Sequence, residues 1–237
     1  MKPFLYLDCW HERQAPTAFD KALAATGLPI ETYCTNDGAF PDHMDFSGAY
    51  VSPSFNGAYD NLPWVNRLHD VLREFGTAGV PMLGVCFGSQ ILASSLVGRD
   101  QVFIRSERER GPGHIRLTAA GREDLLSRNV PEKVASFHWH GDEVRADHPD
   151  IVILADSSDC GNQIWRWAGH PVWGVQAHIE LGGDGLKGWL AGNPETFLKG
   201  GLDPAAVDVE TVFDERSFGF LQNFLDFVLE RERDKRS

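Results

Sequence analysis

The segment 81–96 constrains the fold of this chain more than any other. Residues 81–85 form an apolar run, and residues 84–88 read Gly-x-Cys-x-Gly before a second apolar stretch begins. A buried strand that passes directly into a helix is the setting in which this pattern forms a nucleophile elbow. Glycines on both sides of Cys86 permit the close backbone approach and the unusual φ and ψ angles of so tight a turn. The segment therefore predicts a strand over 81–85 and a helix over 87–96, joined at Cys86.

Cys86 is the candidate nucleophile of this turn. Its sulfur would lie at the helix N-terminus, where partial positive charge favours the thiolate. The backbone N–H of Phe87 would point into the site as an oxyanion donor. The alternative is a buried core thiol, since free cysteine is among the most buried residue types. The remaining cysteines lack a base-and-glycine context and are expected to be packing thiols: Cys9, Cys34 and Cys160.

The first half of the chain alternates short apolar runs with helical patterns. Helices are predicted over 15–26 and around 64–75, the second from apolar residues at helical spacing. This rhythm implies right-handed crossovers and a mostly parallel sheet. Further strands are predicted at 4–7, 30–33 and 49–51.

The second half is richer in strand signals, which predicts an added antiparallel portion. We therefore expect an α/β fold in a single domain over 1–237, with a central, mostly parallel sheet flanked by helices and a flavodoxin-like arrangement. Segment 181–216 has no clear period and is expected to be an irregular excursion or lid. A last helix precedes a charged tail, 230–237, that is expected to fray. The additional strands are predicted at 101–104, 115–117, 134–137, 151–155, 163–167 and 172–176.

Composition excludes several classes of partner. The net charge of -12 opposes binding to a phosphate backbone, so no nucleic-acid partner is expected. No apolar stretch approaches the length of a membrane span, and residues 1–8 read as a core strand rather than a signal peptide. Four widely spaced cysteines without a Cys-x-x-Cys pair are expected to be free thiols in the cytoplasm. The sequence assigns no oligomeric state.

A base and an acid for Cys86 are supplied by the segment 172–180. It begins as an apolar strand and ends in His178-Ile179-Glu180. In an extended chain, residues two apart point to the same side, so Glu180 can orient the imidazole and leave its other nitrogen for Cys86. Either residue alone is a weak signal, but their occurrence together with the elbow is far more specific.

These residues resemble the class I glutamine amidotransferases, whose elbow Gly-x-Cys-x-Gly-x-Gln is matched at 84–90. The family's Gln-(aromatic)-His-Pro-Glu motif is similar to 176–180, its His-Gly-Asp-x-Val stretch to 140–144, and its mid-chain to 109–118. The resemblance covers about residues 45 to 180 and looks closest to stand-alone members similar to the amidotransferase part of GMP synthase, including γ-glutamyl peptidases. It implies a Cys-His-Glu triad, no metal or cofactor, and substrate contacts from Gln90, His140 and Gly141.

Two departures from the family pattern stand out. Ala177 and Ile179 replace the usual aromatic residue and proline, without removing a catalytic atom. Val51-Ser52-Pro53 stands where the family has Gly-Gly-Pro, whose backbone gives the second oxyanion N–H. The backbone N–H of Ser52 is the expected donor here, and Asn56-Gly57 is expected to supply flexibility.

The resemblance implies that Cys86 attacks the γ-amide of glutamine or a γ-glutamyl compound, forming a thioester that water hydrolyses. Released ammonia would pass to a separate synthetase subunit, or the protein would act alone as a γ-glutamyl peptide hydrolase. A non-catalytic relative that binds glutamine or a partner is a further alternative. Another is a metal-binding protein, because His138 and His140 lie on one side of a predicted strand and His178 is available to join them.

Overall fold

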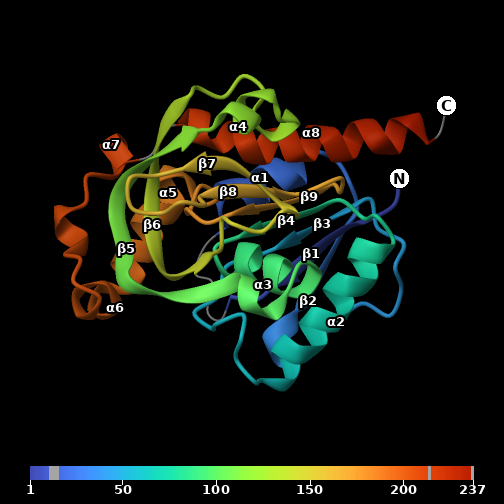
Figure 1. Ribbon diagram of the computed structural model, residues 1–237, viewed down its shortest axis with the longest axis horizontal. Coiled ribbons are helices and arrows are strands. Elements are labelled where there is room, and N and C mark those ends of the chain that lie inside the picture. Colours follow the sequence, from blue (N-terminus) through green and yellow to red (C-terminus); the bar gives the residue numbers. More distant parts are fainter. Residues whose placement is uncertain (11–15, 213–214, 236–237) are drawn as a thin grey trace.

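The fold is built on one mixed sheet, described here from a computed structural model that covers residues 1–10, 16–212 and 215–235. Among these residues, nine strands pair in the order β2-β1-β3-β4-β9-β8-β7-β5-β6 (Figure 1). The first five strands of that order are parallel to one another. The predicted flavodoxin-like α/β arrangement is therefore confirmed. The parallel strands are β1 (Phe4–Asp8), β2 (Ile30–Cys34), β3 (Gly48–Val51), β4 (Met82–Val85) and β9 (Val172–Val175).

The antiparallel portion follows β9 in the sheet and is longer than the sequence predicts. The predicted strands 101–104 and 115–117 are the two ends of one strand, β5 (Val102–Leu117). It pairs along almost its whole length with β6 (Lys133–Val144), with a register shift between Ile104 and Glu109. This register places Glu109 opposite His140, so that the two side chains can interact. The two remaining strands are β7 (Ile151–Asp156) and β8 (Ile164–Trp167).

Helices cover both faces of the sheet (Figure 1). One face carries α1 (Ala18–Ala25) and α8 (Gly219–Asp234), and the opposite face carries α2 (Pro63–Thr77) and α3 (Phe87–Leu96). Each helix buries one apolar side against the alternating side chains of the strands, which divides the core into two clusters. The short helix α4 (Ala119–Glu123) lies between β5 and β6 in the chain. Residue 15 of the predicted first helix lies outside the described residues.

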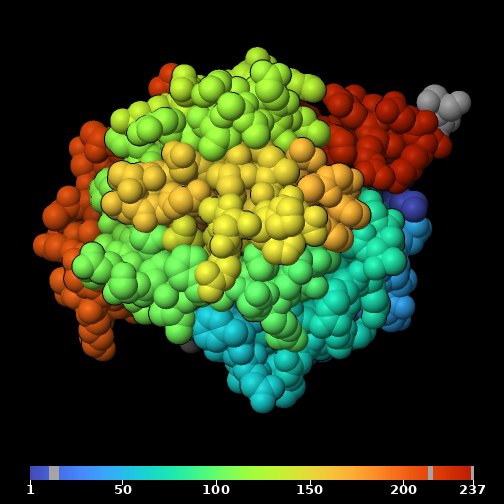
Figure 2. All heavy atoms as spheres, viewed as in Figure 1, coloured from blue at the N-terminus to red at the C-terminus, as the bar shows by residue number. Residues whose placement is uncertain are grey.

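The segment predicted to be irregular is largely helical. It contains α5 (Gly182–Gly192), α6 (Pro194–Lys199) and α7 (Val209–Val212), and residues 213–214 lie outside the description. These helices have a core of their own, in which Trp139 of β6 packs with Trp189 and Phe197. Figure 2 shows α6 and α7 at the left edge of the molecule. Glycines at 182, 183, 185 and 188 have low helix propensity, so the sequence of α5 does not show a helical pattern.

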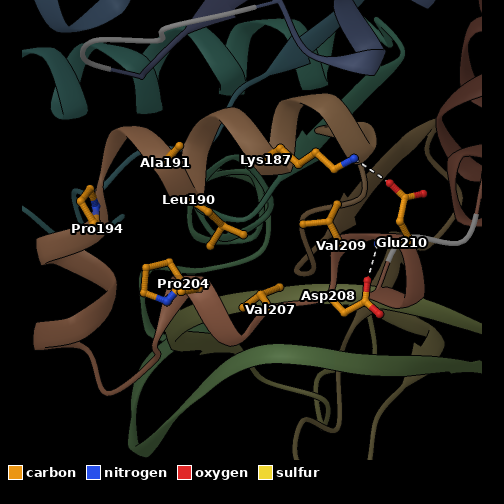
Figure 3. A pocket seen from close by; sticks show the side chains of 10 residues that line it. Lys187, Leu190, Ala191, Pro194, Pro204, Val207, Asp208, Val209 and Glu210 are labelled. Carbon is orange, nitrogen blue, oxygen red and sulfur yellow. Dashed lines mark hydrogen bonds and ion pairs between the residues drawn. The ribbon is translucent and has the colours of Figure 1, made fainter.

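A shallow apolar groove lies on the outer side of α5, between this helix, α6 and α7 (Figure 3). Leu190, Val207 and Val209 line it, and an ion pair of 2.6 Å between Lys187 and Glu210 closes one end. On another side of α5, Trp189 packs into the interior cluster.

The charged C-terminal tail is helical and not frayed through Asp234. Helix α8 continues to this residue, and Glu232 is buried with an ion pair of 3.0 Å to Lys235. The expectation for 230–237 is therefore wrong for 230–234, while residues 236–237 lie outside the description. In the described part of the chain, no helix has both the length and the apolar character to cross a membrane.

Candidate functional site

Cys86 occupies a strained turn between β4 and α3. Its φ and ψ are 53° and -111°, a region that residues with a side chain rarely adopt. Its N–H donates to the carbonyl of Val175 over 2.8 Å, which ties the turn to the end of β9. Phe87 is the first residue of α3, where N–H groups have no partner within the helix. The elbow predicted from the sequence is thus the local geometry observed.

Two glycines make this turn possible. A Cβ atom at Gly84 would lie 2.3 Å from the backbone of Gly88. A Cβ atom at Gly88 would lie 2.0 Å from the carbonyl oxygen of Val51. The turn therefore packs backbone to backbone, and it holds the end of β3 against the start of α3.

His178 and Glu180 meet as the sequence predicts. The Nδ1 atom of His178 lies 2.9 Å from Oε1 of Glu180, and both side chains are buried. His178 lines a narrow pocket together with Cys86. The imidazole therefore has its acid on Nδ1 and shares the pocket with the thiol.

Helix α1 holds the His–Glu segment in place. The N–H groups of Ala18 and Phe19, the first two of the helix, donate to the carbonyls of Leu181 and Glu180 over 3.1 Å each. The N–H of His178 donates to the carbonyl of Phe137 over 2.9 Å. The first N–H groups of a helix have no partner within the helix. Here they find partners in the backbone carbonyls of the segment that carries Glu180, and these bonds hold that segment in place. These bonds supply the rigidity that proline would give in place of Ile179.

The acid controls the charge of His178. Burial by itself lowers the pKa of His178, but the negative charges of Glu180 and Cys86 outweigh burial and raise the pKa to about 10. Protonated His178 therefore stabilises the fold fully below its ordinary value of 6.5, and this contribution is lost as pH rises towards 10. We expect the stability difference between the wild type and Glu180→Gln to be larger at pH 6.5 than at pH 10. Urea unfolding at both pH values measures it, and an equal difference at both would contradict the pairing.

Ser52 does not offer the free N–H that the family comparison implied. Its backbone N–H already donates to the carbonyl of Leu7 over 3.1 Å, as part of the β1–β3 pairing. Its Oγ accepts from the N–H of Cys9 over 2.8 Å. Ser52 is therefore committed to the sheet, because a side chain there finds partners that glycine lacks. Ser54, two residues on, lines the pocket beside Cys86.

Gln90 and His140 are also bound within the protein. The amide nitrogen of Gln90 lies 3.1 Å from Oε1 of Gln176 and 3.3 Å from the carbonyl of Asp142. Neither Gln90 nor His140 is among the residues that line the pocket of Cys86. Gly141 lies instead beside the side chain of Arg108. The roles of Gln90, His140 and Gly141 as substrate contacts stay predictions, and in this structure the side chains of Gln90 and His140 bond within the protein.

Among the residues that the structure describes, one cluster has donor atoms placed for a metal: Glu109, His138 and His140, whose ligand atoms lie within 4.8 Å of one another. His178 is not part of it, so the three-histidine set expected as an alternative does not form. Glu109 already accepts from Ser157 over 2.8 Å and from Gln163 over 2.7 Å, and lies 2.7 Å from Nε2 of His140. These bonds satisfy the carboxylate, which is typical of a buried structural network.

Aromatic side chains form most of the pocket wall around Cys86 and His178. No motif singles out Trp10, Phe55 or Trp139 as site residues, and Trp189 lies in segment 181–216, which was expected to be an irregular excursion or lid. No local signal marks Trp10, which reaches the site because β1 runs parallel to β4 and ends at the same edge of the sheet. The pocket is lined by Trp10, Pro53, Ser54, Phe55, Cys86, Trp139, His178 and Trp189.

The four cysteines are expected to differ in reactivity. Burial raises the pKa of the Cys9 thiol to about 12 and also raises the pKa of Cys160, which leaves little thiolate on either. Cys34 is exposed. Iodoacetamide should therefore label Cys34 and Cys86, while a glutamine-like electrophile should label Cys86 alone. Peptide mass mapping measures this, and glutamine should protect Cys86 but not Cys34. Labelling of Cys34 and not Cys86 by the analogue would contradict the site.

Comparison with known proteins gives consistent matches. The sequence model of the family described as glutamine amidotransferase class-I matches residues 13–184. A GMP synthase of Edwardsiella ictaluri is 37% identical over 109 residues, which are 44% of this chain and 20% of that protein. γ-Glutamyl peptidase 4 of Arabidopsis thaliana is 26% identical over 149 residues, which are 59% of this chain and 57% of that protein. The chain thus spans only part of the length of these curated relatives.

Solved structures show the same fold. A glutamine amidotransferase from Thermotoga maritima superposes with a TM-score of 0.83 at 22% identity, covering 97% of this chain and 98% of that one. A glutamine amidotransferase from Methylobacillus flagellatus superposes with a TM-score of 0.81 at 22% identity, covering 97% and 95%. The agreement extends to the helical excursion, since almost the whole chain is covered.

Proposed function

Because the chain belongs to the class I glutamine amidotransferase family, we propose that it hydrolyses a γ-glutamyl amide through a thioester on Cys86. The observation that carries this proposal is the elbow cysteine in one pocket with His178, whose other nitrogen is bonded to Glu180. A strained nucleophile, a base and an orienting acid serve no structural purpose together.

The proposed reaction has two halves. The Cys86 thiolate attacks the γ-carbonyl carbon, and the N–H of Phe87 donates to the oxyanion. A second donor is required, and the loop after Ser52 supplies it in place of Ser52 itself. His178 protonates the leaving nitrogen while Glu180 stabilises the imidazolium. Water, activated by the then neutral His178, hydrolyses the thioester and releases glutamate. No metal or organic cofactor takes part.

The charged end of the γ-glutamyl group needs partners outside the aromatic pocket. Asp142 and Arg108 supply opposite charges on the side of α3 that carries Gln90, whose amide holds the carbonyl of Asp142. Tyr59 donates to Asp142 over 3.1 Å, and Arg108 lies against Gly141. An ammonium group and a carboxylate on one carbon match these two charges. We propose Asp142 and Arg108 as contacts of the α-amino and α-carboxylate groups.

Two fates of the nitrogen share this chemistry. In the first, ammonia from glutamine passes to a separate synthetase subunit, as the partial match to GMP synthase allows. In the second, the protein acts alone on γ-glutamyl peptides or amines. The greater share of γ-glutamyl peptidase 4 that the chain covers favours the second, as does the apolar pocket next to His178.

A substrate screen tests the proposal. Glutamate and amine release are measured for glutamine, γ-glutamyl amines and γ-glutamyl dipeptides, with and without cell extract. Release by the purified protein alone supports the hydrolase, whereas strong stimulation by a co-purifying protein supports the amidotransferase. Binding of these compounds without glutamate release in either condition would contradict the enzyme and support a non-catalytic relative.

A further inference from the structure

The pocket beside the triad has four aromatic walls. The ring centroid of Trp189 lies 4.9 Å from that of His178, and Trp10 lies 5.3 Å from Trp189 and 6.3 Å from His178. Trp139 and Phe55 complete the enclosure. The four rings come from the end of β1, the loop after β3, strand β6 and helix α5. Distant parts of the chain thus converge to make one side of the pocket apolar.

This side of the pocket suits the leaving group rather than the glutamyl group. Among the described residues that line the pocket, Cys86 and His178 alone have ionisable side chains. The glutamyl end of any substrate carries an ammonium and a carboxylate, and burying either without a partner is costly. The proton that the leaving nitrogen needs comes from His178, which lies against Trp189 and Trp10. The group attached to that nitrogen must therefore lie among the aromatic rings.

The small volume of the pocket places the leaving group at its mouth, the outer part formed by Phe55 and Trp10. Its interior measures about 30 Å³, which has room for little beyond the reacting amide. Phe55 is 59% exposed, unusual for so large an apolar residue, and its ring lies 6.2 Å from that of Trp10 at an interplanar angle of 77°. These two rings form an edge-to-face pair, and a substrate ring that packs against the exposed side of Phe55 would extend it with contacts of the kind aromatic pairs prefer. The mouth is thus prepared for an aromatic group.

The wall also contains an unused donor. The indole N–H of Trp189 is buried, and among the residues the structure describes it has no hydrogen-bond partner. Buried donors are normally paired, and the π face of a substrate ring packed on this wall would give the N–H a weak acceptor. Trp139 is 8% exposed and packs on Phe197, which keeps the inner wall rigid while the mouth stays accessible.

We infer that Trp10, Phe55, Trp139 and Trp189 form a leaving-group subsite for an uncharged aromatic amine, so that the substrates are γ-glutamyl arylalkylamides. This inference rests on the proposed function and specifies its substrate class. The γ-amide C–N bond breaks, the amine leaves with a proton from His178, and the γ-glutamyl group remains on Cys86 until water releases glutamate. A leaving group with its own carboxylate is disfavoured, because the described residues on the aromatic side of the pocket offer it no cation.

The test compares γ-glutamyl benzylamide with γ-glutamyl ethylamide and glutamine. Both amides release alkylamines, so the chemistry of the leaving nitrogen is similar and the ring is the main difference. We expect kcat/KM for the benzylamide to exceed that for the ethylamide at least about tenfold. The ratio of the two should fall at least about fivefold in Phe55→Ala. Leu198→Ala is the matched control, because Leu198 is 57% exposed and lies outside the pocket; it should keep the wild-type ratio.

The outcomes separate this inference from the proposed function. Hydrolysis of glutamine or the ethylamide at an equal or higher kcat/KM than the benzylamide overturns the aromatic subsite and leaves the proposed function standing. A ratio that survives Phe55→Ala overturns the role of the mouth. Failure to hydrolyse any of the three compounds, with or without cell extract, overturns the proposed function and the inference with it.

Discussion

Replacing Cys86 with alanine is expected to abolish release of glutamate from γ-glutamyl amides while the protein stays folded. Removing the nucleophile of a Cys-His-Glu site leaves no covalent route, and loss of an equivalent group in a hydrolytic triad lowers kcat by on the order of 10⁶-fold. We expect a fall of at least about 10³-fold here. Alanine keeps a Cβ at the strained φ of 53°, so the turn should be retained. Steady-state kinetics and a circular dichroism melt measure both effects.

Cys34→Ala is the control for this variant, since Cys34 is exposed and two strands separate β2, which it ends, from the β4 strand of the elbow. It should keep wild-type kcat and KM. Because the nucleophile and its base act as a unit, Cys86→Ala combined with His178→Ala should be no slower than Cys86→Ala alone. Unchanged turnover in Cys86→Ala would refute the assignment of the nucleophile.

Replacing Gly88 with alanine is expected to cause a large loss of stability from a single added methyl group. The new Cβ would lie 2.0 Å from the carbonyl oxygen of Val51 and 2.8 Å from its carbon. Both are backbone atoms of the sheet, so the clash is relieved only by moving β3 or the elbow. We expect a loss of about 4 kcal/mol or more in the free energy of unfolding, measured by urea titration.

Gly188→Ala is the matched control, because it adds the same methyl group in the interior of α5. A Cβ there meets nothing within 4 Å, so the helix propensity of alanine should dominate. We expect a gain of about 0.5–1 kcal/mol, or no change. Equal stability of the Gly88→Ala and Gly188→Ala variants would show that the close backbone approach at the elbow does not affect the free energy of unfolding.

Local patterns account for the parts of the site that sequence predicts correctly. The strand before Cys86, the helix after it and the glycines between them lie within one short segment, so periodicity and turn chemistry suffice. The contact between His178 and Glu180 joins residues only two apart in the sequence, although they lie beyond the end of β9, where the N–H of Ile179 donates to the carbonyl of Ala177 over 3.1 Å. The parallel half of the sheet follows in the same way, from alternating strand and helix signals.

The elements missed by sequence depend on tertiary contacts. The middle of β5 is charged and shows no alternation of apolar residues, because it projects into solvent beside β6. Helix α5 is rich in glycine and forms around Trp139, Trp189 and Phe197 rather than through its own propensity. The partner of His140 depends on a pairing register that puts Glu109 opposite it. No pattern within a single segment contains that information.

At Cys86, the backbone angles that the elbow requires lower the stability of the protein, while the side chain is required for activity. A side chain at this φ and ψ costs of order 1–3 kcal/mol, and glycine alone would remove most of that cost. Selection for heat resistance without an activity screen would therefore drive position 86 towards glycine, yielding a tougher and inert protein. Conversely, mutations elsewhere that raise the melting temperature add stability, which offsets the cost of keeping cysteine at position 86. Efforts to evolve this protein for new amides should begin from such a stabilised background.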